Sequence, residues 1–226
     1  MKNEKFILVV PCKLLFGPLS AAAERGPFPE WKAGSNYFEG FRPHNEVDFA
    51  SRILSNFTYM KRGLAEQDAT HKQPIGYSII VNPKLKKIFA YQRASHDEKY
   101  GEKRLQGKWS WGVGGHIEKM DTDGGNPLEM SMQRELEEEV SISGSITPKI
   151  LGYINNDSDE VGKVHFGVLH IIETDSSSIQ PKDAEIDNGK MRTIAELEEI
   201  CASPSFAVEE WSRIALAPLK KYFSSL

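Results

Sequence analysis

Short apolar segments separated by turns and charged loops dominate the middle of the chain. Tyr77–Val81 and Lys87–Gln92 are rich in β-branched and aromatic residues, and the Asn-Pro-Lys sequence between them is typical of a turn, so the pattern predicts a β-hairpin. Similar segments follow, and the further predicted strands are Trp109–Val113, Lys149–Asn155, Val164–Ile172 and Lys190–Ile194. Because side chains alternate along a strand, Trp109, Trp111 and Val113 are expected on one face.

Helical spacing of apolar residues predicts the remaining elements. Asn126-Pro127-Leu128-Glu129 combines a cap residue, a proline suited to the first turn and a glutamate three positions after the cap. A helix is therefore expected from this point to about Val140. The other predicted helices are Asn45–Asn56, Ile194–Ile200 and Phe206–Phe223. This order of strands and helices predicts a mixed α/β or α+β domain.

The first residues have two interpretations. A basic start, a short apolar run and Ala21-Ala22-Ala23 form a weak signal-peptide pattern. Pro11 and Lys13 interrupt the apolar run, so a buried strand over Phe6–Phe16 is the favoured interpretation. We expect residues 1–74 to be an extension packed on a core of residues 75–200, followed by a C-terminal helix within residues 201–226.

Composition limits the class of protein. The 226 residues are 39% hydrophobic and 27% charged, with a net charge of −4, which is typical of a soluble globular chain. The sequence has no basic surplus of the kind that general nucleic-acid binders show, and no apolar stretch approaches the ~20 residues of a membrane span. Two cysteines far apart favour a reduced, cytoplasmic setting over a disulfide framework.

The predicted helix that ends near Val140 carries a concentration of glutamates. At roughly 100° per residue, Glu138 lies about 60° to one side of Glu135 and Glu139 about 40° to the other, so the three carboxylates share one face. Glu137 points almost the opposite way. An apolar stripe lies beside the acidic face and consists of Leu128, Met132, Leu136 and Val140.

Like charges at this spacing repel each other, and a divalent cation would reverse that effect. Carboxylate oxygens suit Mg²⁺ or Mn²⁺, and such ions can hold a diphosphate and activate a water molecule. The glycines at positions 112, 114 and 115 would allow close approach of the backbone. The alternative is a surface helix whose glutamates are simply solvated.

These residues resemble the signature of the Nudix (MutT-like) hydrolase family, Gly-x5-Glu-x7-Arg-Glu-U-x-Glu-Glu-x-Gly-U, where U is a bulky aliphatic residue. The chain supplies Gly115 and then the segment Arg134–Ile142. It departs in three ways: the gap before Arg134 is about five residues longer, Asn126 stands where the early glutamate falls, and Ser141 replaces the last glycine. The arginine's partner is then lost, or is supplied by Glu118, Asp121 or Asp123.

The resemblance implies an α/β/α sandwich with a mixed sheet and a metal-dependent pyrophosphohydrolase. Its substrate would be a nucleoside diphosphate linked to another moiety, and its cofactor Mg²⁺ or Mn²⁺. The implied metal ligands are Glu135, Glu138, Glu139 and the carbonyl of Gly114. The implied catalytic residues are Glu135, Glu138 and Arg134. The implied phosphate or substrate loop comprises Gly115, His116 and Glu118, with Glu185 or Glu160 as an additional acid.

Other functions stay open on the sequence alone. A Nudix fold that binds nucleotides or regulates without strong catalysis is one alternative, since Asn126 and Ser141 depart from the signature. A diphosphate isomerase of the same superfamily is another, but it would need a cysteine near the core, and Cys12 and Cys201 both lie outside residues 75–200. The N-terminal extension could build a substrate lid or a homodimer interface. The expected partner is a small nucleotide-like diphosphate, with no stable nucleic-acid or membrane partner.

Overall fold

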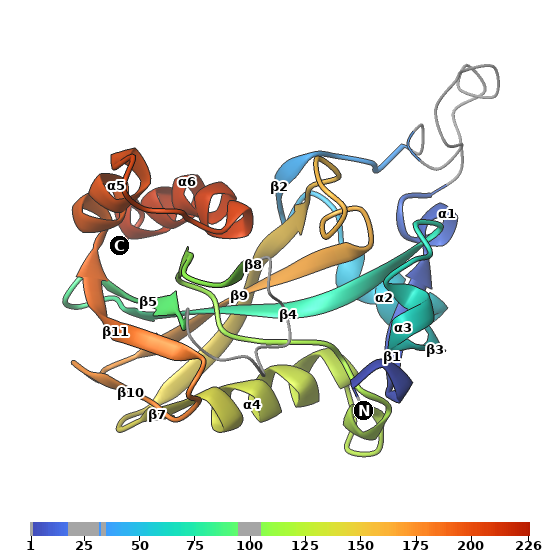
Figure 1. Ribbon diagram of the computed structural model, residues 1–226, viewed down its shortest axis with the longest axis horizontal. Helices are drawn as coiled ribbons and strands as arrows, with labels where there is room; N and C mark the ends of the chain where they lie inside the picture. The colour runs from blue at the N-terminus through green and yellow to red at the C-terminus, as the bar shows by residue number, and fades with distance from the viewer. Residues whose placement is uncertain (1, 18–31, 33–34, 95–104) are drawn as a thin grey trace. The chain divides into compact units, whose positions relative to one another are not determined.

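The computed structural model describes residues 2–17, 32, 35–94 and 105–226 and has an α+β architecture (Figure 1). The chain forms two compact units. The first unit contains residues 1–76, 115–131 and 151–168, and the second contains residues 77–114, 132–150 and 169–226. In the described ranges, no helix has both the length and the apolar character needed to span a membrane.

Strands and helices alternate at the start of the chain, and runs of consecutive strands follow. The strands are β1 (Phe6–Pro11), β2 (Gly40–Pro43), β3 (Thr58–Lys61), β4 (His71–Asn82), β5 (Lys87–Arg93), β6 (Trp109–Ser110), β7 (Val140–Ile142), β8 (Ile146–Asn155), β9 (His165–Thr174), β10 (Ile179–Pro181) and β11 (Ile186–Thr193). Within the described residues, the α-helices are α1 (Cys12–Leu15), α2 (Phe49–Asn56), α3 (Arg62–Ala65), α4 (Pro127–Glu139), α5 (Ile194–Ala202) and α6 (Glu210–Ser224), and the 3₁₀ helices are η1 (Lys2–Glu4) and η5 (Lys119–Thr122).

The first unit has an aromatic core. Its strand β1 pairs antiparallel with β3 and with the start of β4, and β2 pairs antiparallel with the end of β8. Phe49 lies at the centre of the core, with its ring 5.1 Å from that of Tyr153 and 5.2 Å from that of Phe166. The hydroxyl of buried Tyr153 accepts a hydrogen bond from the Ala50 N–H at 3.0 Å, which satisfies the polar end of an otherwise apolar side chain.

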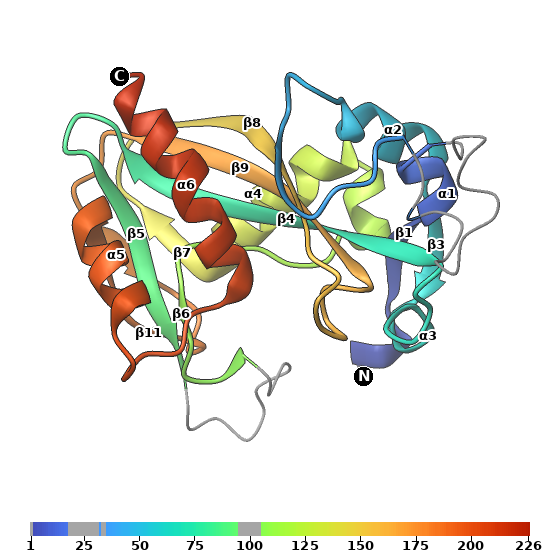
Figure 2. The ribbon, with the colours of Figure 1, turned by 90° about the horizontal axis from the view of Figure 1, so that it is seen from above.

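The second unit has α/β/α layering. In Figure 1, β5 and β11 lie between α4 on one side and α5 with α6 on the other. Figure 2 shows α6 in front of β4, where Trp211 packs edge-on against Tyr77 with 5.6 Å between the ring centroids. The predicted apolar stripe of α4 is confirmed, because Met132, Leu136 and Val140 are buried in the core of this unit.

The predicted hairpin is also confirmed in the second unit. Strands β4 and β5 pair antiparallel with Val81 opposite Ile88, and Asn82 stabilises the turn by accepting a hydrogen bond from the Leu85 N–H at 2.9 Å. Strand β11 pairs antiparallel with β5, and β10 pairs with β7.

Several predicted boundaries were wrong. The N-terminal strand ends at Pro11 rather than Phe16, because the next residues close a helical turn with a hydrogen bond from the Phe16 N–H to the Cys12 carbonyl. The strand predicted over Trp109–Val113 is regular only at Trp109–Ser110, and both faces of this segment are buried. The last helix begins at Glu210. Ala21-Ala22-Ala23 lies outside the described residues.

Candidate active site

The helix α4 begins where the sequence predicts. Asn126 caps it, because the Asn126 side-chain oxygen accepts from the Leu128 N–H at 3.1 Å. Glu129 accepts from the Asn126 side-chain amide at 3.1 Å. The residue that stands in place of the early signature glutamate therefore acts as a helix cap.

The three glutamates of the acidic face lie in the second unit and have different surroundings. The side chain of Glu138 is 60% exposed, whereas that of Glu135 is only 14% exposed. Glu139 is half-buried, and loss of water raises the pKa of its carboxyl to about 8, with the neighbouring charge of Glu135 adding to the rise. Arg93 and a backbone hydrogen bond oppose the rise in pKa without cancelling it.

Arg134 lies among these acids. Its Nη1 donates to Glu135 Oε1 at 2.7 Å and lies 3.5 Å from Glu138 Oε2. The guanidinium thus neutralises part of the acidic face and orients two of its carboxylates. The sequence also suggested Glu118 and Asp121 as partners of Arg134. In the structure Glu118 forms an ion pair with Lys5 at 2.6 Å, and Asp121 accepts a hydrogen bond from the Glu118 N–H at 2.8 Å.

The glycine-rich loop reaches the end of α4. Gly114 adopts a φ of 139°, which favours glycine, and its N–H donates to Glu139 Oε1 at 3.2 Å. Gly112 is held by the Tyr91 hydroxyl, which donates to the Gly112 carbonyl at 2.9 Å. The loop backbone and the Glu139 carboxylate are therefore in direct contact.

Ser141 stands where the signature has its last glycine, and the chain here needs no left-handed residue. Val140–Ile142 continues directly as β7, and among the described residues only Lys86 and Asn188 are non-glycine residues with positive φ. The Glu139 carbonyl accepts from the N–H groups of Lys182 at 2.8 Å and Asp183 at 3.3 Å, which satisfies the end of the helix.

We expect Ser141→Gly to leave turnover unchanged and to lower the free energy of unfolding by about 0.5–1 kcal/mol, because glycine loses more chain entropy in an extended segment. Urea denaturation beside a Ser141→Ala control measures the change. A glycine variant that is more stable than the natural chain would contradict this account of the helix exit.

The two candidates for an additional acid lie in different units. Glu160 belongs to the first unit, is 80% exposed and forms an ion pair with Lys163 at 2.5 Å. Glu185 belongs to the second unit and follows Asp183, whose charge also raises the pKa of Glu139. Sequence reasoning missed Asp183, although it lies in the same acidic loop that suggested Glu185.

The remaining predicted loop residues, Gly115, His116 and Glu118, belong to the first unit. His116 contacts Gln73, with 2.8 Å between His116 Nε2 and Gln73 Oε1, and His165, with 3.2 Å between the two Nε2 atoms. Sequence reasoning missed this pairing, because residues 116 and 165 are distant along the chain.

Comparison with known proteins agrees with this layered fold. The NUDIX domain family model matches residues 72–213. YmaB of Bacillus subtilis (strain 168) is 34% identical over 158 residues, which cover 68% of this chain and 74% of YmaB. The crystal structure of Tm1382, a protein assigned to the Nudix hydrolases, superposes with a TM-score of 0.71 at 26% identity and covers 96% of this chain and 100% of that one.

The chain therefore belongs to the Nudix family. It is a Nudix-type hydrolase, an enzyme that acts on phosphoric anhydride bonds. The predicted family, fold class and enzyme class are confirmed.

Proposed function

We propose that the protein is a metal-dependent pyrophosphohydrolase that cleaves the diphosphate bond of a nucleoside diphosphate linked to another moiety, by attack of water on phosphorus. The observation that carries the proposal is the half-buried carboxylate of Glu139, which lies beside Glu135 and accepts a hydrogen bond from Gly114. Holding carboxylates close together with little water raises the free energy of the folded protein unless a cation binds them. The site is therefore better suited to holding a metal ion than to simple solvation.

The donor set fits Mg²⁺, or Mn²⁺, because it consists of hard oxygen atoms. Glu135, Glu138, Glu139 and the Gly114 carbonyl would hold the ion. When bound, such an ion neutralises diphosphate charge and lowers the pKa of a coordinated water molecule.

The protein's own groups have distinct roles in this proposal. Arg134 orients Glu135 and Glu138 through the contacts described above. Glu138 is the most exposed of the three glutamates, so it is the best placed to meet a solvent-derived nucleophile and accept its proton. Asp183 and Glu185 are the candidates for an additional acid from the second unit.

Other parts of the sequence hypothesis stay predictions. One is the phosphate or substrate loop at Gly115, His116 and Glu118. The others are the division of the chain into an extension, a core and a C-terminal helix at residues 74 and 200, a homodimer, and a cytoplasmic location. The expected partner is a small nucleotide-like diphosphate rather than a nucleic acid.

The test is a Mg²⁺-dependent phosphate-release screen over nucleoside triphosphates, dinucleoside polyphosphates, nucleotide sugars and capped RNA. On the best substrate, Glu138→Gln should lower kcat by about 10²-fold or more with little change in stability, because it removes an exposed proton acceptor. Glu137→Gln is the matched control on the opposite side of the helix, and its activity should be unchanged.

An unchanged rate in Glu138→Gln would contradict the role of Glu138. If calorimetry shows that a nucleoside diphosphate binds with Mg²⁺ while no compound in the screen is turned over, the protein is a binding or regulatory module instead.

A further inference from the structure

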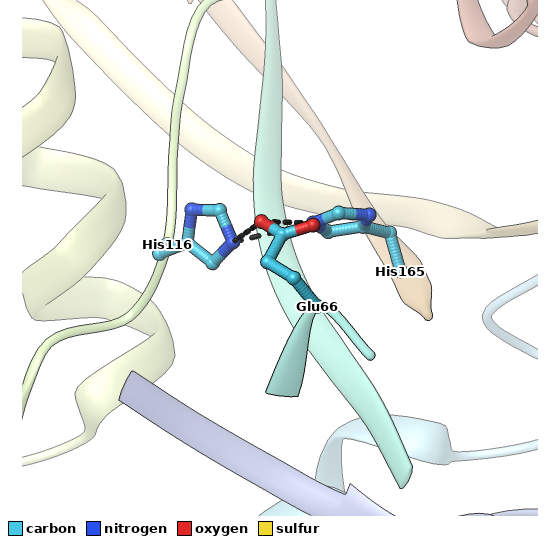
Figure 3. A group of neighbouring side chains, drawn as sticks. All are labelled: Glu66, His116 and His165. Atoms are coloured by element: carbon cyan, nitrogen blue, oxygen red, sulfur yellow. Dashed lines mark hydrogen bonds and ion pairs between the residues drawn. The ribbon is translucent and has the colours of Figure 1, made fainter. Parts of the chain in front are cut away.

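A second group of potential metal ligands lies in the first unit and shares no residue with the acidic helix. Glu66 directly follows α3, His116 follows the glycine-rich loop, and His165 is the first residue of β9. Figure 3 shows the Glu66 carboxylate directed at both imidazole rings. Glu66 Oε1 lies 3.8 Å from His116 Nε2 and 3.9 Å from His165 Nε2.

The distance between the two imidazoles suits a shared ion. His116 Nε2 and His165 Nε2 are 3.2 Å apart. Two nitrogens that bind one tetrahedral Zn²⁺ at about 2.0–2.1 Å are themselves separated by about 3.3 Å. The Glu66 side chain is 23% exposed, so it has room for the small movement that would bring its oxygen equally close.

The orientation of His165 is typical of a metal ligand. Its Nδ1 lies 2.6 Å from the Val161 carbonyl, to which it donates, so the lone pair of Nε2 is directed into the group. The side chains of His165 and His116 are only 7% and 13% exposed. A hydrogen bond from the far ring nitrogen to a backbone carbonyl fixes the tautomer that a metal requires.

Gln73 supplies an independent observation. It is fully buried, its Oε1 lies 2.8 Å from His116 Nε2, and its amide nitrogen makes no hydrogen bond to the described residues. Turning the amide would pair the nitrogen with His116 but leave the oxygen unpaired. In the observed orientation the Gln73 oxygen would be a fourth donor to a metal ion in this group, and the amide nitrogen would keep no partner among the described residues.

Two nearby positive charges have carboxylate partners, and one of them, Arg62, would share Glu66 with a bound ion. Arg62 Nε lies 3.4 Å from Glu66 Oε1, and Lys72 donates to Asp157 at 2.6 Å. The alternative is an ion-pair group in which Glu66 joins Arg62 to the histidines. That alternative leaves the lone pair of His165 Nε2 facing a carboxylate oxygen, because the proton of the neutral ring is on Nδ1, where it is donated to the Val161 carbonyl.

We propose that Glu66, His116 and His165 form a site for a borderline divalent cation such as Zn²⁺. Two imidazoles and one carboxylate leave a coordination position open, and nitrogen donors select against Mg²⁺. The ion would join three segments that are distant in sequence, including the residue next to Gly115. The site goes beyond the proposed hydrolase function and does not depend on it.

The test uses the full chain, stripped with a chelator and then dialysed against micromolar Zn²⁺ in the presence of excess Mg²⁺. The natural chain should retain one equivalent of Zn²⁺ and melt at a higher temperature than the stripped protein. Co²⁺ in place of Zn²⁺ should give the visible absorption of a low-symmetry, four- or five-coordinate ion.

Two variants and two controls locate the ion. Glu66→Gln and His165→Gln should weaken Zn²⁺ binding by at least about 10²-fold and abolish the Co²⁺ absorption, because each removes one of three ligands. His71→Gln changes a partly exposed histidine that pairs with Asp68, and Glu138→Gln changes the acidic helix. Both controls should keep the ion.

Retention of Zn²⁺ by Glu66→Gln, its loss in Glu138→Gln, or the absence of a retained equivalent in the natural chain would overturn the proposal. If His165→Gln fails to fold, Glu66→Gln decides alone, because Glu66 is not part of the buried core. The metal content and the Co²⁺ spectrum do not require turnover, so this result is separate from the test of the hydrolase.

Discussion

Replacing Glu139 with glutamine should lower kcat/KM by on the order of 10³-fold and make the metal-free protein more stable near pH 8. Activity falls because the variant lacks one carboxylate of the proposed metal site, the one that contacts the glycine-rich loop. Stability rises because the amide carries no charge, and its oxygen can still accept the hydrogen bond from Gly114 that now reaches Glu139 Oε1.

The pH dependence of this effect follows from the raised pKa of Glu139. In the metal-free folded protein the pKa of the carboxyl is about 8, whereas its ordinary value is 4.5. The folded state therefore holds a proton that the unfolded state releases, so stability falls as pH rises from about 4.5 to 8. The free energy of unfolding should decline by on the order of a few kcal/mol in this window, and Mg²⁺ should restore it by binding the ionised form.

Thermal melting of both proteins at pH 5, 7 and 9, with and without Mg²⁺, checks this expectation. Glu137→Gln is the control, since Glu137 is exposed and lies on the same helix. If Glu139→Gln keeps the pH dependence of the natural protein, Glu139 is not the group that causes it. Full activity in Glu139→Gln would exclude this residue as a ligand.

Gly112→Ala should destabilise the protein by about 3 kcal/mol or prevent folding, because the new methyl group would collide with a fixed ring. A Cβ at position 112 would lie 2.1 Å from Cζ of Tyr77. That ring cannot turn away, since it is buried against Trp211 and its hydroxyl lies 2.6 Å from Ser212 Oγ. Chemical denaturation of the variant measures the loss.

Gly40→Ala separates the steric effect from the backbone effect. Gly40 has a φ of 87°, but a Cβ there would meet no atom within 4 Å. Replacing it with alanine should lower the free energy of unfolding by only about 1 kcal/mol, the ordinary penalty for a left-handed residue with a side chain. Equal losses in the two variants would show that contact with Tyr77 is not what requires glycine at position 112.

The acidic helix was predictable because its features are local. The Asn126 cap follows from a side chain that can accept from the first free N–H groups of the helix. The buried stripe of Met132, Leu136 and Val140 and the shared face of the glutamates follow from a period of 3.6 residues. The hairpin of β4 and β5 was predictable for a similar reason, since two short apolar segments flank a turn sequence. The boundary error after Ser110 arose where a hydrogen bond to a distant segment ends the strand, since the Trp111 N–H donates to Ser212 Oγ. The boundary error after Pro11 arose where the next residues close a helical turn instead.

By itself, the sequence determined the family, the fold class and the face of α4 that carries the acids, because these depend on residue types at fixed short spacings. Only the tertiary structure decided that the pKa of Glu139 is raised, that Ser141 needs no left-handed backbone, and that Glu66 meets two histidines. Each of these depends on the water, backbone groups or side chains that surround a residue after folding. Such surroundings come from segments far away along the chain, and no local pattern specifies them.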